Sequence, residues 1–488
     1  MEMVGNRVLK TVAMLMGIAL MAVPVQSQTR PDAASIAVLM VSDIHFEPFW
    51  DPAKVQKLAA APVAQWEAIL AAPDSADRAQ QFAALQQKCK TRGEDTSFPL
   101  LRSSLAAMKA NAAGAKFVTL SGDLISHGFP CKFEATVSNR TAGDYQTLVE
   151  KTIGFVQLEL RKSFPQVPVY AALGNNDSDC EDYKLDAQSP FLANVGSLMT
   201  ADVAKPQQKQ ALSSFAAQGN YSVLLPSPMR AARLLVIDDL FQSREYKTCG
   251  GKEDPAAVDA QISWLRDQLT AARKNHESVW VMGHIPPGIN PYATIRSMKN
   301  VCDGASTTLF LSSDALGSTL AEFGDVVKLA VFGHTHMDEM RLLEPVNSQD
   351  ASDASQPIAL KIVPSISPVD GNNPSFMVAQ VNAATATLED YRVIAASNHT
   401  GIDTNWSEEY AFRKAYGKPD FSGKSVAVLM AGFQSDPQAD SAASSEYLKD
   451  YFVRDASLAL KAFWPQYVCA LDNRTTETYR TCLCGSGK

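Results

Sequence analysis

Aspartate, asparagine and histidine gather in five short clusters, and each cluster follows a run of apolar, often β-branched residues. This pattern is typical of buried strands that deliver side chains to a site at their carboxyl ends. The clusters are Asp43-Ile44-His45, Gly122-Asp123, Gly174-Asn175-Asn176-Asp177, Gly283-His284 and Gly333-His334-Thr335-His336. Four of the seven histidines lie in them, and His127 follows Asp123 by four residues. Chance accounts for one such cluster but not for five, so the pattern predicts a metal site.

The residue types also indicate the chemistry. Carboxylate oxygen, amide oxygen and imidazole nitrogen together accept Zn, Mn or Fe, so the identity of the metal stays open. Two divalent ions about 3.5–4 Å apart can hold a phosphoryl group and activate a water for in-line attack, with a carboxylate bridging them. In a strand, residues i and i+2 point to one face, so Asp43 and His45 are expected to face one site. The same spacing recurs at His334 and His336.

The apolar runs predict the strands of an α/β layered fold. They cover residues 35–43, 116–123, 167–177, 233–239, 278–284, 327–336 and 359–367. Residues 99–113 and 256–275 lie between strands and show helical patterns, the second with apolar residues at three-to-four spacing. Residues 375–396 hold two extended runs around a polar turn, which predicts a hairpin.

The two ends of the chain differ from this pattern. Arg7 and Lys10 precede an apolar stretch that is too short for a membrane anchor, and Val25 and Ser27 then fit a cleavage site. We therefore expect a signal peptide over residues 1–27, export to a periplasm or the extracellular space, and no transmembrane segment. Aromatic-rich helical patterns at 406–417 and 444–471 follow a predicted catalytic domain, residues 28–399. They predict a helical, cysteine-containing C-terminal subdomain over residues 400–488.

Charge and cysteine content restrict the partners and the compartment. The formal charge is −8, and loss of residues 1–27, which carry a net +1, makes it −9. This balance favours neither general nucleic-acid binding nor adsorption to anionic membranes. The eight cysteines all follow the predicted signal peptide, which favours disulfides. By position we expect Cys131 and Cys180 to bond to each other or to Cys89, Cys249 to bond to Cys302, and Cys469 to bond to Cys482 or Cys484.

In order and combination, the five clusters resemble the five motifs of the calcineurin-like metallophosphoesterases. The resemblance implies a β-sandwich flanked by helices around two divalent metal ions. Carried over by position, it implies one metal held by Asp43, His45 and His336, a second held by Asn175, His284 and His334, and Asp123 bridging the two.

A narrower resemblance concerns the acid sphingomyelinase-like phosphodiesterases, which share the stretches GDLISH (122–127), GHIPPG (283–288) and GHTHMDEM (333–340). In that branch the histidine four residues after the bridging aspartate lies on the leaving-group side. The resemblance therefore implies that His127 is the general acid. A purely supporting role of His127 in its loop is the structural alternative.

Two departures from the family bear on the substrate. Only about eight residues separate the expected cleavage site from the first strand, so the lipid-binding module of sphingomyelinases proper is expected to be absent. Position 176 is asparagine, whereas the family usually has a substrate-facing histidine there. The resulting GNND sequence resembles the motif of endopolyphosphatases. Asn176 can donate a hydrogen bond but cannot carry a proton, which predicts an altered substrate or pH preference.

These observations predict an exported two-metal phosphoric ester hydrolase. Its expected substrate is a small phosphodiester, a nucleotide or a polyphosphate, and endopolyphosphatase activity is the first alternative. A non-catalytic protein that captures phosphorylated ligands through a metal is the alternative from another class. The complete set of motif ligands weighs against that alternative.

Overall fold

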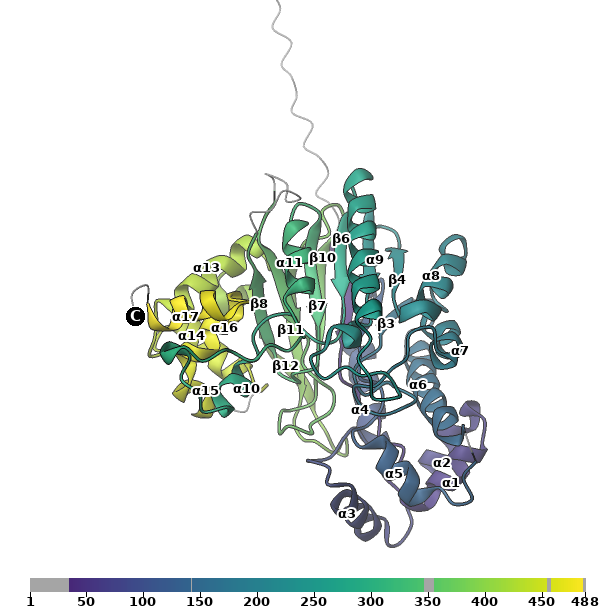
Figure 1. Cartoon of the computed structure of the whole chain (residues 1–488). Helices are drawn as coiled ribbons and strands as arrows, with labels where there is room; N and C mark the ends of the chain where they lie inside the picture. The colour runs from purple at the N-terminus through teal and green to yellow at the C-terminus, as the bar shows by residue number, and fades with distance from the viewer. Residues whose placement is uncertain (1–34, 142, 346–354, 454–457, 486–488) are drawn as a thin grey trace, which may run out of the picture. The chain divides into compact units, whose positions relative to one another are not determined.

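The computed structural model describes residues 35–141, 143–345, 355–453 and 458–485. Two six-stranded sheets form the centre of this part of the chain, and helices flank them (Figure 1). The predicted signal peptide lies outside the described residues. Among the described residues, no helix combines the length and the apolar composition that a membrane span requires.

The first sheet has the strand order β12-β11-β10-β1-β2-β3. Its strands are β1 (Ser35–Val41), β2 (Val118–Ser121), β3 (Val169–Ala172), β10 (Ser375–Asn382), β11 (Leu388–Ala396) and β12 (Trp406–Ala411). Strands β1, β2 and β3 are parallel, whereas β10, β11 and β12 extend the sheet by antiparallel pairing. The predicted hairpin at residues 375–396 is thereby confirmed as β10 and β11.

The second sheet has the order β4-β5-β6-β7-β9-β8. Its strands are β4 (Tyr221–Leu224), β5 (Ala232–Val236), β6 (Ser278–Met282), β7 (Val327–Phe332), β8 (Glu339–Leu343) and β9 (Ile358–Ile362). The four inner strands are parallel, and β4 and β8 are antiparallel edges. All seven apolar runs therefore form strands, while β4 and β8 are additional.

Alternating side chains of the second sheet divide between two cores, as period-two patterning requires. In β5, Leu234 belongs to the large core shared with β1, β2 and β3 of the first sheet. Its neighbour Leu235 belongs to a smaller core with Leu265 and Leu269 of α9. Because both faces of the parallel strands are covered by apolar side chains, the expected helix-flanked β-sandwich is confirmed.

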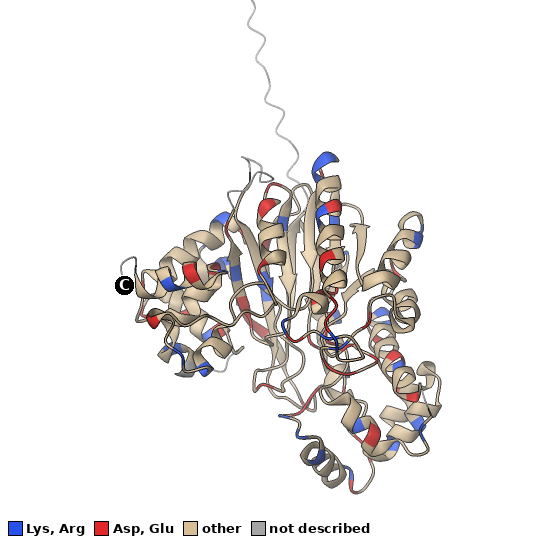
Figure 2. Cartoon of the chain, in the orientation of Figure 1, with Lys and Arg blue, Asp and Glu red and all other residues tan. Residues whose placement is uncertain are grey.

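The helices lie outside the sheets (Figure 1). Between Pro52 and Glu322 they are α1 (Pro52–Ala60), α2 (Trp66–Ala71), α3 (Arg78–Cys89), α4 (Phe98–Asn111), α5 (Phe129–Thr136), α6 (Asp144–Ser163), α7 (Pro190–Met199), α8 (Lys205–Gln218), α9 (Pro255–Lys274), α10 (Pro291–Arg296) and α11 (Ala315–Glu322). Toward the C-terminus they are α12 (Phe412–Tyr416), α13 (Gly423–Gln434), α14 (Ala442–Asp450), α15 (Leu458–Ala462), α16 (Trp464–Asp472) and α17 (Thr476–Cys484). Figure 2 shows Lys and Arg interspersed with Asp and Glu over these helices.

The helical prediction for residues 406–417 is wrong over its first half. Residues 406–411 form β12, which pairs with β11, and only the short α12 follows. The buried Tyr410 explains the difference, since its hydroxyl donates to Asp338 Oδ2 at 2.8 Å and fixes this segment against the sheets. Tertiary contacts of this kind override local helical propensity. The helical prediction for residues 444–471 agrees with α14, α15 and α16.

Four disulfides join all eight cysteines: Cys89–Cys131, Cys180–Cys249, Cys302–Cys484 and Cys469–Cys482. The first and the last were among the expected pairs. The expected bond between Cys249 and Cys302 is wrong, and Cys180 bonds to neither Cys131 nor Cys89. Spacing along the sequence could not reveal that α17 brings Cys484 to the loop after α10.

Candidate metal centre

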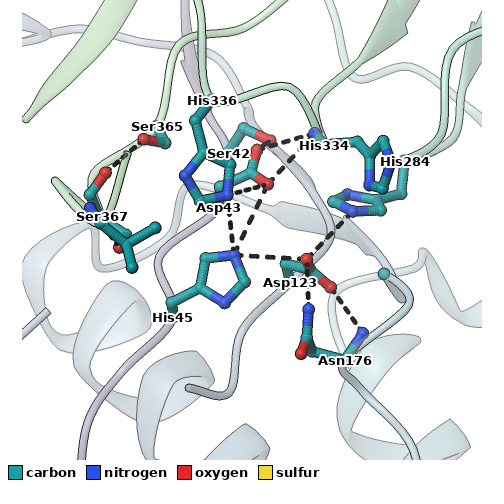
Figure 3. Close-up of polar contacts among 12 residues, drawn as sticks. Ser42, Asp43, His45, Asp123, Asn176, His284, His334, His336, Ser365 and Ser367 are labelled. Atoms are coloured by element: carbon teal, nitrogen blue, oxygen red, sulfur yellow. Dashed lines mark hydrogen bonds and ion pairs between the residues drawn. The ribbon is translucent and has the colours of Figure 1, made fainter. Parts of the chain in front are cut away.

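The five clusters meet where the two sheets end. Asp43, Asp123 and Asn175 follow β1, β2 and β3 of the first sheet. His284 follows β6, and His334 follows β7, both in the second sheet. Figure 3 shows Asp43, Asp123 and the histidines converging on one small volume. The parallel order of these strands explains the convergence, because the carboxyl ends of parallel strands lie at one edge.

One group of donor atoms surrounds the side chain of His45. Its Nε2 lies 3.1 Å from Nε2 of His336 and 3.3 Å from Oδ2 of Asp123. Oδ1 of Asp43 lies 3.4 Å from the same His336 nitrogen and 3.8 Å from that of His45. These are the three ligands expected for the first metal, together with the expected bridge.

A second group surrounds the amide oxygen of Asn175. This Oδ1 lies 3.1 Å from Nε2 of His284 and 2.9 Å from Nδ1 of His334. Oδ2 of Asp123 lies 3.2 Å from the same His284 nitrogen. A single carboxylate oxygen, Oδ2 of Asp123, therefore belongs to both groups.

The spacing of these atoms fits divalent cations. Ligands at bonds of about 2.0–2.2 Å around a tetrahedral ion lie about 3.3–3.6 Å from one another. The separations within the two groups, from 2.9 Å to 3.8 Å, bracket this value. The mixture of carboxylate, amide and imidazole donors suits Zn, Mn or Fe and does not select among them.

Backbone carbonyls orient two of the imidazoles. Nδ1 of His45 lies 2.9 Å from the carbonyl oxygen of Ile125, and Nδ1 of His284 lies 2.8 Å from that of Ser121. A carbonyl oxygen can only accept, so each Nδ1 carries a proton and each Nε2 is the atom that faces the metal group. Such outer contacts fix the tautomer and the orientation of metal-binding histidines.

Five of the seven expected ligands have left-handed backbone conformations: Asp43, His45, Asp123, His334 and His336, with φ between 42° and 73°. The D-x-H and H-T-H segments therefore lie beyond the strands, and the expectation that an extended strand aligns their side chains is wrong. Non-glycine residues in this region cost of order 1–3 kcal/mol each and cluster at functional sites. Their concentration here indicates that the strain is maintained for the geometry of the site.

Glycines allow the clusters to approach one another. A Cβ atom on Gly122 would lie 2.6 Å from Nδ1 of His284, so any larger residue would displace that ring. A Cβ atom on Gly174 would overlap Oδ1 of Asp123. At Gly122 and Gly174, the absence of a side chain thus makes room for an expected ligand that follows another strand.

The electrostatics of the centre favour positive charge. Burial opposes ionisation of Asp123, but the charges of His284 and His45 outweigh burial and hold the pKa of this carboxyl well below its usual value. Burial by itself lowers the pKa of both histidines, but the negative charge of Asp123 and further acidic contacts outweigh burial. The pKa of His45 is therefore raised to about 9 and that of His284 to about 10. Two metal ions can replace the protons that these rings hold beside Asp123.

His127 lies beside the first group of ligands. Its ring stacks on that of His45 with centroids 4.0 Å apart and planes inclined by 20°. A ring nitrogen of His127 comes within 4.8 Å of donor atoms of His45 and His336, close enough for these three to form a metal group. Stacked imidazoles have lone pairs in nearly parallel planes, however, so the rings of His45 and His127 cannot both point at one ion. This geometry favours a role of His127 toward the substrate.

Asp95 is a further residue of the site that the sequence motifs do not include. Oδ1 of this buried carboxylate lies 3.0 Å from Nδ1 of His127, and Oδ2 accepts the backbone N–H of His127 at 2.8 Å. Ser367 donates to Oδ1 at 2.9 Å. Along the sequence, Asp95 lies between α3 and α4 and does not follow a strand, so no motif signals it. Asp95 holds Nδ1 of His127, so Nε2 is the atom that can exchange a proton.

Asn176, which is expected in the place of a substrate-facing histidine, also contacts the shared carboxylate of Asp123. Its backbone N–H donates to Oδ1 of Asp123, and its side-chain Nδ2 donates to Oδ2, both at 2.9 Å. Figure 3 shows both contacts. The amide at position 176 therefore orients the shared carboxylate, and it also lines the cavity described next.

A cavity of about 420 Å³ opens onto the centre. It is lined by the metal-group residues Asp123, Asn175, His334 and His336, by His127, Asn176, Asp182 and Tyr183, and by the segments 89–92 and 369–370 together with Gly128. A cavity of this size accommodates a small molecule that reaches both donor groups.

The pattern of the calcineurin-like phosphoesterase family matches residues 36–338, which is more than half of the chain. The chain belongs to this family. Membership in this family identifies the protein as a metal-dependent phosphoric ester hydrolase. The five clusters of expected ligands lie within the matched residues.

Curated relatives agree with this assignment. The chain is 28% identical over 411 residues to an acid sphingomyelinase-like phosphodiesterase 3b of Homo sapiens, which covers 80% of this chain and 81% of the relative. It is 26% identical over 409 residues to a cyclic GMP-AMP phosphodiesterase of Mus musculus, with 80% and 82% covered. Among solved structures, a dimetal phosphatase from Danio rerio matches 77% of this chain and 99% of its own, with 13% identity and a TM-score of 0.39.

Proposed function

We propose that the protein is an exported dimetal phosphodiesterase that hydrolyses a small, water-soluble phosphodiester or phosphoanhydride. One observation carries the proposal, namely that Oδ2 of Asp123 lies 3.3 Å from the ligand nitrogen of His45 and 3.2 Å from that of His284. An oxygen shared in this way is the bridge that a pair of ions requires. Four disulfides support export, since disulfides form in oxidising compartments.

The metal ligands proposed are Asp43, His45, His336, Asn175, His284 and His334, with Asp123 shared. When bound, the two ions supply Lewis-acid activation of water and neutralise charge on the phosphoryl oxygens. The chain itself orients the donors: Ile125 and Ser121 fix the rings of His45 and His284, and Asp182 accepts the Nδ2 proton of Asn175 at 2.8 Å, which turns the amide oxygen toward the histidines.

We assign the general acid to Nε2 of His127. The oxygen of water bonds to phosphorus and releases one proton to solvent, while the bond from phosphorus to the leaving oxygen breaks. Nε2 gives its proton to that leaving oxygen, and His127 is then protonated again from solvent. Asp95 is held ionised for this task, because the positive charge of His127 outweighs burial and lowers the pKa of the carboxyl. An ionised Asp95 stabilises the protonated ring and keeps Nδ1 as the donor of their hydrogen bond.

Hydrolysis of bis-p-nitrophenyl phosphate tests the proposal. Metal-depleted protein should be inactive, and addition of Mn²⁺ or Zn²⁺ should restore turnover. A panel of a choline phosphodiester, a nucleotide and polyphosphate then separates phosphodiesterase from endopolyphosphatase activity. A protein that binds these compounds in the presence of metal but turns over none of them would be a phospho-ligand binding protein, and the proposal would be wrong.

A further inference from the structure

The cavity at the metal centre has two cationic side chains on one wall, Lys90 and Arg92. They belong to residues 90–93, which we call the α3 loop because it follows directly on that helix. Both are exposed, and neither forms an ion pair with any described residue. The acidic residues of the cavity are engaged elsewhere: Asp123 in the metal centre, Asp182 with Asn175, and Asp370 at 3.7 Å from Nδ1 of His336. The loop cations are therefore available to a ligand.

The α3 loop is held in place from several sides. The Cys89–Cys131 disulfide ties its beginning to α5, the helix that follows His127. Gln86 donates from Nε2 to the carbonyl oxygen of Gly93 at 2.9 Å. Thr91 lies against Gly128, since a Cβ atom on that glycine would be 2.9 Å from the Thr91 methyl carbon. The loop is thus fixed beside the proposed general acid before any substrate arrives, and a fixed loop loses little entropy on binding.

Lys90 occupies a position that usually belongs to glycine. It ends α3 in the left-handed conformation, with φ 53° and ψ 33°, and its N–H donates back to the last turn. Glycine adopts this conformation without the steric cost that a Cβ atom brings. A lysine at the end of a helix interacts favourably with the helix dipole, which is the structural explanation for its presence. Its place in the wall of the cavity offers a second explanation.

We propose that Lys90 and Arg92 bind a second phosphate of the substrate, next to the phosphoryl group that lies at the metals. This inference rests on the proposed function and narrows it to phosphoanhydrides, such as nucleoside polyphosphates. Hydrolysis joins the oxygen of water to the attacked phosphorus and breaks the anhydride P–O bond. The proton from His127 goes to the departing phosphate oxygen, whose remaining charge faces the two loop cations. A phosphodiester with one phosphate gains nothing from them.

The test compares two substrates that share a nucleoside, namely thymidine 5′-triphosphate and the p-nitrophenyl ester of thymidine 5′-monophosphate. The measured quantity is the ratio of their kcat/KM values with metal-loaded full-length protein. The double variant Lys90→Gly/Arg92→Gln should lower this ratio about 10-fold or more at low salt, mainly through KM of the triphosphate. Lys88→Gln is the matched control, because Lys88 is exposed on the last turn of α3 but does not line the cavity. It should leave the ratio within twofold of the wild type.

The glycine substitution separates recognition from structure. If Lys90 acts only at the helix end, Lys90→Gly alters the melting temperature and leaves the ratio unchanged, which overturns the inference. If Lys90 binds phosphate, the ratio falls while the melting temperature stays constant or rises, because glycine suits the left-handed position. Absence of turnover of both thymidine compounds by the wild type would overturn the proposed function and this inference together. An unchanged ratio in an active double variant overturns the inference alone.

Discussion

Asp95 holds His127 through two contacts: its Oδ1 lies 3.0 Å from the ring Nδ1, and its Oδ2 accepts the backbone N–H of the same residue. The two residues are separated by 32 positions in the sequence. Because the carboxylate fixes both the ring and the main chain of His127, the position of Nε2 at the cavity depends on Asp95. A carboxylate–imidazole pair of this kind is typical of general acid–base catalysis.

The leaving group reveals whether His127 is the general acid. His127→Gln should lower kcat about 10²–10⁴-fold for the methyl ester of thymidine 5′-monophosphate, whose poor leaving group needs a proton. For the p-nitrophenyl ester the loss should be at least 10-fold smaller, because nitrophenolate leaves without protonation. Bound metal, measured by atomic emission, should stay at the wild-type level. Equal losses for both esters would argue against proton donation, and loss of metal would make His127 a ligand.

Asp95→Asn should reproduce part of this effect. The amide keeps the size of the side chain but removes the charge that stabilises the protonated ring, so kcat for the methyl ester should fall about 10²-fold with little change in KM. Asp95→Glu is the control that retains the charge, and it should recover part of the activity. An Asp95→Asn protein with wild-type kcat would show that the pair is structural only.

Asn176 should contribute to metal affinity. Its Nδ2 donates to the oxygen of Asp123 that both donor groups share. Removal of an outer contact to a metal ligand typically costs 10–100-fold in metal affinity or activity. Asn176→Ala should therefore raise the dissociation constant for Mn²⁺ by about 10-fold in isothermal titration calorimetry. An unchanged constant would place the function of Asn176 on the substrate side alone.

Asp450 should make the protein less stable as the pH rises. Its carboxyl is buried, accepts the Tyr416 hydroxyl at 3.0 Å and lies 3.9 Å from Lys449 Nζ, and Asp338 and Glu446 are nearby acids. Burial, followed by the charge of Asp338, raises the pKa of Asp450 to about 8. The folded state therefore holds a proton that the unfolded state releases above pH about 4. The contribution of protonated Asp450 to the free energy of unfolding is therefore fully present below pH about 4, and it is lost as the pH rises to about 8.

Asp450→Asn tests this relationship, because the amide keeps the shape but cannot ionise. At pH 8 the variant should gain about 1–3 kcal/mol in the free energy of unfolding, and at pH 4 it should match the wild type. Urea denaturation at several pH values provides the measurement. Asp440→Asn, at an exposed position before α14, is the control. If the free energies of unfolding of Asp450→Asn and of the wild type changed in parallel with pH, Asp450 would not be the source of the pH dependence.

The sequence predicted the strands well and singled out residues that the structure brings together, for one physical reason. Strands buried on both faces are nearly continuous apolar runs, and the polar residues at their ends are conspicuous, so Asp43, Asp123 and His284 could be recognised together. Asp95 and β12 lack such a signal. Asp95 is identified only by its distance to His127, and residues 406–411 form a strand through pairing with β11 and the contact of Tyr410 with Asp338.

The backbone conformation of the expected ligands could not be predicted from the sequence either. The D-x-H spacing of Asp43 and His45 suggested side chains on one face of a strand, whereas both residues have positive φ and lie past the end of β1. The side chains still converge, by a strained turn instead of an extended strand. Sequence spacing thus predicted the convergence of Asp43 and His45 for an incorrect geometric reason.

A metal titration of wild-type and Asp123→Asn protein reveals whether Asp123 joins two metal ions into one hydrolytic centre. Metal-depleted wild-type protein should bind two Mn²⁺ ions per chain, and hydrolysis of bis-p-nitrophenyl phosphate should rise with their binding. Asp123→Asn, with its folding checked by circular dichroism, should lose at least one ion and lower turnover by more than 10³-fold. An Asp123→Asn protein that keeps both ions and wild-type turnover, or a metal-free wild type with full activity, would show that Asp123 does not join two ions into a hydrolytic centre.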